Sequence, residues 1–399
     1  MTMTKISQQF KDEISSELNE IQKYWEQYGI DNKNGGFVGR RDYSNKQIFG
    51  APKGVILNTR ILWTFSAIGN FKKDDDLRFY ANRAYEYLNK NFRDREFEGV
   101  FWELDALGKP VNKRKQIYAQ AFAIYALSEY FIFSGKEEAK DWALSIFELI
   151  EKYARDENLN GYIEAFQVDW SPIEDMRLSS KDKNSTKTMN THLHILEAYT
   201  TLFQISKSQT VKEALGNLIQ LFIKKFYDSK NHHFQLFFDN NWGIEGNIVS
   251  FGHDIEAVWL LIEAAKAVDN QKFLSEIEIM TIDVAETFLK EAYVENSGVI
   301  NEKNLDTGQL DEDRHWWPQI EAMVGLNYAY LISGKEYFIK AQKDIWQFVK
   351  DHIVDKENGE WFFRIDKYNI PYKEEDKIGM WKCPYHNSRG CIYLLKMDN

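Results

Sequence analysis

Apolar residues recur at intervals of three and four along much of this chain, which is the pattern of amphipathic helices. Between Thr4 and Tyr28 the apolar positions are Ile6, Phe10, Ile14, Leu18, Ile21 and Trp25. This spacing places them on one face of a helix. We therefore predict a helix over residues 4–28 that buries one face and exposes the other.

Six more strongly apolar helices are expected to follow at regular intervals. Their predicted starts lie near residues 57, 118, 190, 252, 317 and 385, so the period is about 60–70 residues. Each of the first five leads into a second, more polar helix through a short turn, as at Gly69-Asn70, Ser134-Gly135 and Ser333-Gly334. Each second helix is expected to end in a turn-rich, strand-like piece, as at residues 99–103, 161–164 and 359–363.

The sixth helix pair is divided between the two ends of the chain. The helix over 4–28 takes the place of its second helix, and the segment from residue 385 takes the place of its first. A closed ring needs such a split, whereas an open stack of repeats needs a cap at each end. We predict an all-α fold with one domain over residues 1–399. It forms an (α/α)6 barrel of twelve helices, with short β-hairpin-like loops at its mouth.

Composition narrows the possible partners. The net charge of −11 and the lack of a basic stripe argue against binding to nucleic acid or to anionic membranes. No run of eighteen apolar residues predicts a membrane span, and the start of the chain lacks the pattern of a secretory signal. Cys383 and Cys391 are typical of reduced thiols. We expect a cytoplasmic protein, monomeric or alternatively homodimeric.

Side chains that can carry chemistry gather at one phase of the repeat, the start of each apolar helix. Because the inner helices of such a barrel run parallel, these starts surround one mouth, where converging polar groups indicate a small-molecule site. The polar and aromatic residues in this set are Arg60, Tyr118, Asn190, His194, His253, Glu256, Trp317, Glu321, His386 and Arg389. Further aromatic faces suited to stacking on a sugar are those of Trp316, Trp381 and Tyr385.

Four histidines occur as two close pairs in the sequence. His192 and His194 are two residues apart, so on a helix they point in nearly opposite directions. The four-residue step from Asn190 favours His194 as the one that faces the barrel. His232 and His233 lie in a turn region, and we assign both to the surface.

Carboxylates provide a rival interpretation. Glu256 shares a helical face with His253, which suits an orienting pair, a metal site or a simple ion pair. No second pair is phased to complete a metal site, so we expect no metal. Barrels of this kind also host glycosidases that use two acids. The candidate acids are Glu256, Glu321, Asp169, Asp175 and Asp182. Because this scheme leaves the histidines unexplained, an inverting glycosidase is the alternative. A sugar-binding protein without activity is another.

Four separated strings resemble those of the cellobiose 2-epimerases, within the N-acylglucosamine 2-epimerase superfamily. They are MNTHLHILEA (189–198), FGHDIEAVW (251–259), RHWWPQIEA (314–322) and WKCPYHNSR (381–389). Their order matches, and the likeness covers essentially the whole chain. The resemblance implies the same (α/α)6 barrel. It also implies inversion at C2 of the reducing-end glucose of β-1,4-linked disaccharides, without a metal or nucleotide cofactor.

The resemblance also implies roles for individual residues. His253 and His386 match the two acid/base histidines, and His194 matches a third that supports sugar binding and ring opening. The residues that match polar contacts and stacking positions are Arg60, Tyr118, Asn190, Glu256, Glu321, Trp317 and Trp381. Trp316 remains an alternative to Trp317. An aldose–ketose isomerase and an N-acylglucosamine 2-epimerase remain alternatives within the superfamily.

The chemistry of C2 epimerisation suits histidine. It requires a ring-opened aldehyde, loss of the C2 proton to give an enediolate, and return of a proton to the opposite face. A group that titrates near neutrality serves as base in one direction and as acid in the other. We expect Arg60 to stabilise the enediolate oxygens and Glu256 to orient His253. The expected partner is a small disaccharide such as cellobiose or lactose.

Overall fold

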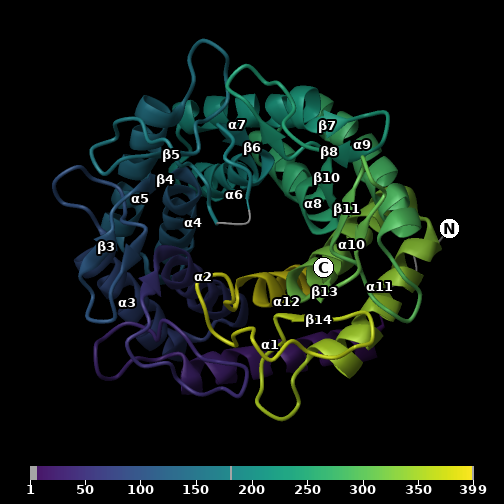
Figure 1. Ribbon diagram of the computed structural model, residues 1–399, viewed down its shortest axis with the longest axis horizontal. Coiled ribbons are helices and arrows are strands. Elements are labelled where there is room, and N and C mark those ends of the chain that lie inside the picture. The colour runs from purple at the N-terminus through teal and green to yellow at the C-terminus, as the bar shows by residue number, and fades with distance from the viewer. Residues whose placement is uncertain (1–6, 180–181, 398–399) are drawn as a thin grey trace.

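The computed structural model of the protein describes residues 7–179 and 182–397. Within these residues twelve α-helices form two concentric rings (Figure 1). The inner ring consists of α2 (Val55–Lys72), α4 (Ile117–Ser134), α6 (Met189–Ser206), α8 (Phe251–Val268), α10 (Trp316–Ser333) and α12 (Tyr385–Lys396). The outer ring consists of α1 (Gln8–Tyr28), α3 (Arg78–Tyr87), α5 (Glu137–Leu149), α7 (Gln209–Leu221), α9 (Gln271–Glu291) and α11 (Glu336–Phe348).

The inner ring is closed. Each inner helix packs against the next, and the last of them, α12, packs against α2. The same helix packs against α1, so the two ends of the chain together supply the sixth helix pair. The predicted (α/α)6 barrel is confirmed, and the predicted starts of the inner helices agree with the observed ones to within two residues.

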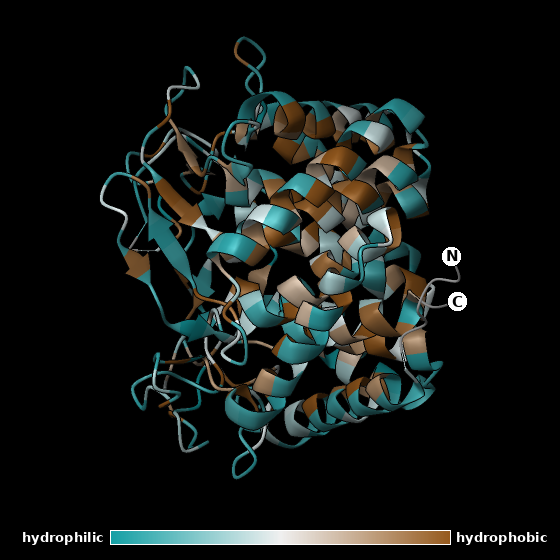
Figure 2. Cartoon of the chain, turned by 90° about the vertical axis from the view of Figure 1, so that its right-hand side faces the viewer, coloured by the Kyte–Doolittle hydropathy of each residue, from teal (hydrophilic) through white to brown (hydrophobic). Residues whose placement is uncertain are grey.

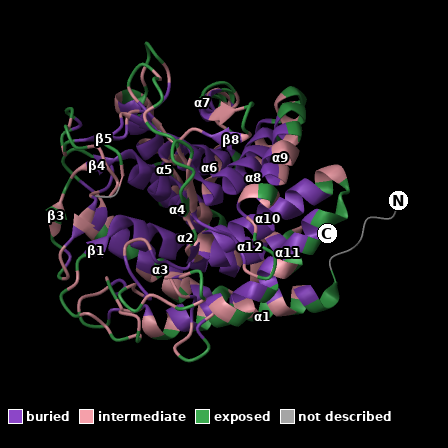
Figure 3. Cartoon of the chain, turned by 45° about the vertical axis from the view of Figure 1, so that its right-hand side comes forward, coloured by how far each residue is buried: buried purple, intermediate pink, exposed green. Residues whose placement is uncertain are grey.

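Burial distinguishes the two rings (Figure 3). Every residue of α2 from 55 to 69 is buried, because neighbouring inner helices flank it and outer helices cover its back. By contrast, α1 buries one stripe, made of Phe10, Ile14, Leu18, Ile21, Tyr24 and Trp25. The predicted positions 4–6 lie outside the described residues. Among the described helices, none is both long enough and apolar enough to cross a membrane.

Four outer helices end in the same way. A five-residue π-helical turn extends α3, α5, α7 and α11: η2 (Leu88–Phe92), η3 (Ile150–Ala154), η4 (Phe222–Phe226) and η5 (Val349–Ile353). A short 3-10 turn, η1 (Asp75–Leu77), precedes α3. The strand-like pieces predicted after these helices are mostly single bridges, formed by Val100, Tyr162 and Trp361. They are too short to form strands because only one residue of each pairs across a tight turn.

Short strands gather at one end of the barrel, where the inner helices begin (Figure 2). Each inner helix from α2 to α10 is preceded by a strand that pairs antiparallel with a later strand: β1–β2, β4–β5, β6–β9, β10–β11 and β13–β14. The bounds are β1 (Lys53–Gly54), β2 (Glu103–Leu104), β3 (Pro110–Asn112), β4 (Lys115–Gln116), β5 (Ala165–Phe166), β6 (Lys187–Thr188), β7 (Tyr227–Asp228), β8 (His233–Phe234), β9 (Phe237–Phe238), β10 (Ile248–Ser250), β11 (Glu302–Asn304), β12 (Leu310–Asp311), β13 (Arg314–His315) and β14 (Arg364–Ile365).

One of the predicted turns is wrong. Gly69 lies inside α2, which ends only at Lys73, a residue in the left-handed conformation with φ of 56°. Gly69 serves close packing instead, since a Cβ there would lie 2.4 Å from the Phe133 ring of α4. The turns at Gly135 and Gly334 are confirmed: their φ values of 72° and 70° end α4 and α10 in a conformation that glycine adopts without strain.

A repeated ion pair fixes the rim of the barrel. In four repeats a lysine that precedes an inner helix reaches an aspartate in the turn after an outer helix. The pairs are Lys53–Asp31 (2.9 Å), Lys115–Asp94 (2.6 Å), Lys187–Asp156 (2.8 Å) and Lys377–Asp355 (2.7 Å). Because loss of one partner would leave an unpaired charge in the interior, each pair ties the two layers together where the site is built.

Candidate active site

A cavity of about 630 Å³ opens at the end of the barrel where the inner helices begin. A volume of this size is typical of small-molecule sites. The predicted residues that line it are Arg60, Tyr118, Asn190, His194, His253, Glu256, Trp316, Trp317, Trp381 and His386. Glu321, Tyr385 and Arg389 are buried outside this lining. The helix starts therefore converge as the repeat predicts.

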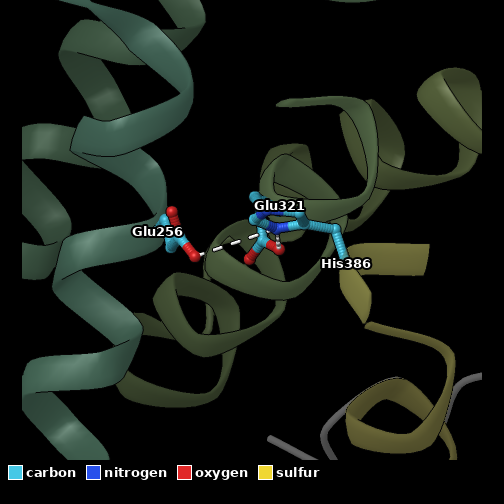
Figure 4. Close-up of side chains that lie close together, drawn as sticks. All are labelled: Glu256, Glu321 and His386. Carbon is cyan, nitrogen blue, oxygen red and sulfur yellow. Dashed lines mark hydrogen bonds and ion pairs between the residues drawn. The ribbon is translucent and has the colours of Figure 1, made fainter. Parts of the chain in front are cut away.

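A carboxylate holds His386 (Figure 4). Its Nδ1 lies 2.7 Å from Glu321 Oε1, and Trp259 Nε1 donates to the other oxygen of that carboxylate at 3.1 Å. A carboxylate that accepts from these donors places the imidazole hydrogen on Nδ1, which leaves Nε2 as an acceptor. Burial lowers the pKa of His386 well below its usual value, and the charges of Arg60 and Arg389 lower it further.

A hydroxyl holds His253. Its Nδ1 lies 2.7 Å from Oγ of Ser250, the residue that precedes α8. The His253 ring lies 4.8 Å from the Trp317 ring, and the His386 ring lies 5.4 Å from the same indole. Burial lowers the pKa of His253 to about 3, with the charge of His194 as the second cause. Two neutral imidazoles from different helices therefore pack against one indole.

The expected pairing of Glu256 with His253 is not formed. Instead, Glu256 Oε1 accepts a hydrogen bond from Arg389 Nη2 at 2.5 Å. The buried guanidinium needs acceptors, and it competes successfully for this carboxylate. Burial, followed by the charge of Glu321, raises the pKa of Glu256 to about 7. The actual partner of His253, Ser250, was missed. Its place three residues earlier, at the N-cap of the helix, was the available signal.

Arg389, which is buried outside the cavity lining, links three carboxylates: those of Glu197, Glu256 and Glu321. Although burial opposes this charge, the carboxylates raise the pKa of Arg389 well above its usual value. Glu256, Glu321 and His386 place ligand atoms within 4.8 Å of one another, a donor set that could hold a metal. Arg389 Nη2 already bonds both carboxylates, so the cluster is built as an ion pair rather than as a metal cage.

The same contact bears on the glycosidase alternative. Paired catalytic carboxyls stand about 5 Å apart in retaining enzymes and about 6.5–9.5 Å apart in inverting ones, with a sugar bond between them. Here one guanidinium nitrogen bridges Glu256 and Glu321, and Glu321 does not line the cavity. The pair therefore leaves no room for an inverting reaction between its members.

His194 has a carboxylate partner that the sequence reasoning missed. Its Nδ1 lies 3.0 Å from Glu197 Oε2, and Tyr385 Oη donates to the same carboxylate. Glu197 follows His194 by three residues on α6, so the two share a face, and this spacing was the overlooked signal. Tyr385, expected at the mouth, is instead fully buried, with its ring edge against Trp63.

Packing separates the two neighbouring histidines of α6 as predicted. His194 lines the cavity, whereas His192 is turned toward the outer ring. His192 Nε2 accepts from the Tyr162 amide at 2.9 Å, and its Nδ1 lies 2.6 Å from the Thr188 carbonyl oxygen. Nε2 thus joins two repeats, and Nδ1 holds the ring to the start of its own helix.

The assignment of His233 to the surface is wrong. The residue is buried in β8, and its Nδ1 lies 2.7 Å from Asp254 Oδ2 at the start of α8. Strand pairing with β7 turns this side chain inward, which the local turn composition does not reveal. His232 is half-buried and its Nδ1 lies 2.8 Å from Tyr227 Oη.

Three of the described residues that line the cavity carry a buried polar atom without a protein partner. Within the described parts of the chain, Arg60 Nε, Asn190 Oδ1 and Glu256 Oε2 make no hydrogen bond. The other end of the Arg60 guanidinium is fixed, because Nη2 donates to Tyr118 Oη at 2.8 Å. Buried polar groups are rarely left unsatisfied, so these atoms indicate a ligand rich in hydroxyl groups.

Aromatic faces differ in their access to the cavity. Trp316 is 1% exposed and meets His386 edge-on, whereas Trp317 is only partly buried. Trp381 lies with its ring centroid 6.0 Å from that of Tyr118. Of the two adjacent tryptophans, Trp317 therefore has the face that a sugar can reach.

A second cavity of about 520 Å³ adjoins the first. Seven residues line both: Leu178, Ser179, Asp182, Asn190, His253, His315 and Arg364. The other two aspartates considered from the sequence lie apart. Asp169 bonds Ser171 within its own turn, and Asp175 bonds Arg177. Of the three, Asp182 alone lines these two cavities.

The barrel with its histidine-lined mouth suits a sugar epimerase, and similarity to known proteins places the chain in that class. The profile of the N-acylglucosamine 2-epimerase (GlcNAc 2-epimerase) family matches residues 35–388. The chain belongs to this family, as the resemblance of its four strings predicts.

Individual relatives agree closely in length and structure. The chain is 44% identical to a cellobiose 2-epimerase of Bacteroides fragilis, over 96% of this chain and 98% of that protein. It is 40% identical to one of Dictyoglomus turgidum, over 97% and 98%. The solved cellobiose 2-epimerase of Bacillus thermoamylovorans B4167 superposes with a TM-score of 0.94, at 36% identity over 98% and 100% of the two chains. A GH76 α-mannanase of Bacteroides thetaiotaomicron, at 9% identity over 97% of each chain and a TM-score of 0.68, shares the fold alone.

Proposed function

We propose that this protein inverts C2 of the reducing-end glucose of β-1,4-linked disaccharides, converting cellobiose to glucosyl-mannose and lactose to epilactose. The observation that carries the proposal is the pair of imidazoles, from His253 and His386, packed against Trp317 in the cavity. Each has its Nδ1 engaged by the protein, so Nε2 is the nitrogen available to a substrate. The near full-length similarity to cellobiose 2-epimerases supports the substrate class.

The proposed reaction begins with ring opening, supported by His194. One of His253 and His386, starting neutral, removes the C2 proton and leaves an enediolate. The other, which takes up a proton from solvent once the negative enediolate has formed, gives that proton to the opposite face of C2. Arg60 stabilises the negative oxygens between these steps, as a preorganised cation does at an enolate. Solvent resets the two imidazoles, so each turnover places one solvent hydrogen at C2.

The adjoining cavities support a disaccharide rather than a single sugar. The reacting histidines and the stacking tryptophans line the first cavity. The second is continuous with it through Asn190, His253 and His315. A reducing-end ring in the first cavity leaves the second for the glycosidic partner. A monosaccharide would fill only one of them.

Incubation with cellobiose in deuterium oxide, followed by NMR, tests the proposal. We expect glucosyl-mannose with deuterium at C2. Free glucose as the main product would establish a glycosidase instead. A ketose with deuterium at C1 would establish an aldose–ketose isomerase, and binding without any exchange would establish a sugar-binding protein. N-acetylglucosamine under the same conditions tests the remaining alternative, and the His386→Asn variant is the inactive control.

We also propose a cytoplasmic location. Both Cys383 and Cys391 are free and buried. Free thiols persist in reducing compartments, which supports this location. Fractionation of the source cells with an antibody against the protein tests it, and recovery outside the cytoplasmic fraction would contradict it.

A further inference from the structure

We propose that Glu197 is a positioning residue for the reaction: it fixes His194 in the tautomer that carries hydrogen on Nδ1 and presents Nε2 to the substrate. This inference rests on the proposed function for its kinetic consequences only. Its structural core, the tautomer of His194, is measurable without a substrate.

Direct contact carries the first step of the argument. His194 Nδ1 lies 3.0 Å from Glu197 Oε2, and both side chains are almost completely buried. An ionised carboxylate only accepts hydrogen bonds, so the shared hydrogen belongs to Nδ1, and in the neutral imidazole the lone pair lies on Nε2. His194 lines the cavity and Glu197 does not, so the carboxylate acts through the imidazole.

The surroundings keep Glu197 ionised. Tyr385 Oη donates to it, and the Arg389 guanidinium forms an ion pair with it. Burial alone would raise the pKa of this carboxyl, but Arg389 and His194 outweigh it, and the pKa is lowered to about 2. A buried carboxylate held by such donors has one orientation, and its hydrogen bond therefore fixes the orientation of the imidazole as well.

One arginine serves two carboxylate–imidazole pairs. Arg389 contacts Glu197, which holds His194, and it contacts Glu321, which holds His386. The two imidazoles on α6 and α12 are therefore oriented by one buried network. In both pairs it is Nδ1 that faces the carboxylate, so Nε2 is the nitrogen left for the substrate in both.

The Glu197→Gln substitution tests this directly. The glutamine oxygen must stay with Arg389 and Tyr385, because both donate to it. Its amide group then faces His194 and donates to Nδ1, which forces the hydrogen onto Nε2. We expect nitrogen-15 NMR of labelled imidazoles to show this tautomer change, with the His194 signal assigned by its loss in His194→Ala. We expect kcat to fall about 10- to 100-fold, with KM much less affected.

Two controls separate positioning from structural support. Tyr385→Phe removes one donor to Glu197 but leaves the carboxylate, so we expect the Nδ1–H tautomer to remain. Glu151→Gln alters a matched carboxylate, which accepts from Tyr162 and Tyr199 away from the cavity. We expect that variant to lose stability while its kcat stays near that of the wild type.

A double-mutant cycle completes the test. If Glu197 acts through His194, Glu197→Gln has no further effect on the residual deuterium exchange of His194→Ala. An equal loss in both backgrounds would overturn the proposal in favour of a structural role. Should Glu197→Gln fail to fold, the wild-type spectrum still decides, because an Nε2–H tautomer of His194 there would overturn it. Absence of epimerisation by the wild type would instead overturn the proposed function.

Discussion

The two corners of the cavity that hold His253 and His386 are built differently. The His386 corner, between α10 and α12, rests on the Glu321 carboxylate, which Trp259 and Arg389 also contact. The His253 corner, at the start of α8, rests on the hydroxyl of Ser250. A carboxylate only accepts hydrogen bonds, whereas a hydroxyl both donates and accepts.

This difference shows that the proposed acid/base groups are not equivalent. Glu321 holds one tautomer of His386 and stabilises the charge of its imidazolium. Ser250 rotates its hydrogen to suit either state of His253 and contributes no charge. Glu256, which shares a face of α8 with His253, instead pairs with Arg389. One corner is therefore rigid and charge-stabilising, and the other adapts.

Replacement of the histidines gives the largest expected effect. His386→Asn and His253→Asn should each lower kcat by about 10²–10⁴-fold, because each removes a general acid/base. We expect the greater loss at His386, whose charged state has the carboxylate partner. NMR measures the loss of turnover, and calorimetry measures separately whether cellobiose still binds. Near-normal turnover in either variant would contradict the two-base scheme, and binding should persist in both.

Loss of the carboxylate at the rigid corner comes next. Glu321→Gln should lower kcat about 10- to 100-fold, because the amide no longer stabilises the His386 imidazolium. Thermal stability should fall too, since Arg389 loses one of its acceptors. Glu263→Gln is the control, because Glu263 lies on α8 and pairs with Lys266 at the surface. A kcat equal to that of the control variant would show that the corners do not differ.

The pH dependence of the rate distinguishes a carboxyl from the histidines. The pKa of Glu256 is raised to about 7, whereas that of His253 is lowered to about 3. Below pH 7 Glu256 gains a proton and its bond from Arg389 weakens, so kcat should fall as the pH falls through about 7. Glu256→Gln cannot titrate and should lack this limb, with a rate at high pH roughly tenfold lower. If kcat of the variant still fell as the pH fell through about 7, that fall would be assigned to a histidine.

The adaptable corner should give the smallest effect. Ser250→Ala removes one neutral hydrogen bond to His253, which corresponds to about a 2- to 10-fold loss of kcat. Steady-state measurement of kcat for Ser250→Ala and Glu321→Gln, under the same conditions, compares the two corners directly. Thr200→Val serves as the control for loss of a buried hydroxyl, because Thr200 Oγ1 donates to the Leu196 carbonyl oxygen of its own helix. A loss as large as that of Glu321→Gln would make the two corners equivalent.

Most of the fold was predicted from the spacing of apolar residues and from the repeat of about 60–70 residues. The start near 118 was accurate because α4 is apolar on nearly all sides, and that composition changes abruptly at its ends. Gly69 misled the turn assignment because glycine marks both turns and close helix contacts. The turn residues before His233 hid its burial, which only pairing between β7 and β8 reveals.

For the candidate site, most of the side chains that the sequence by itself places at the mouth do line the cavity, because each occupies the same phase of a repeat. The sequence also identified the family through four ordered strings. Only the tertiary structure decided the partners: Ser250 rather than Glu256 for His253, Glu197 for His194, and Arg389 among three carboxylates. The physical reason is that helical spacing orients a residue along its own helix. Hydrogen bonds between buried charges depend on distances across the ring, among helices far apart in the chain.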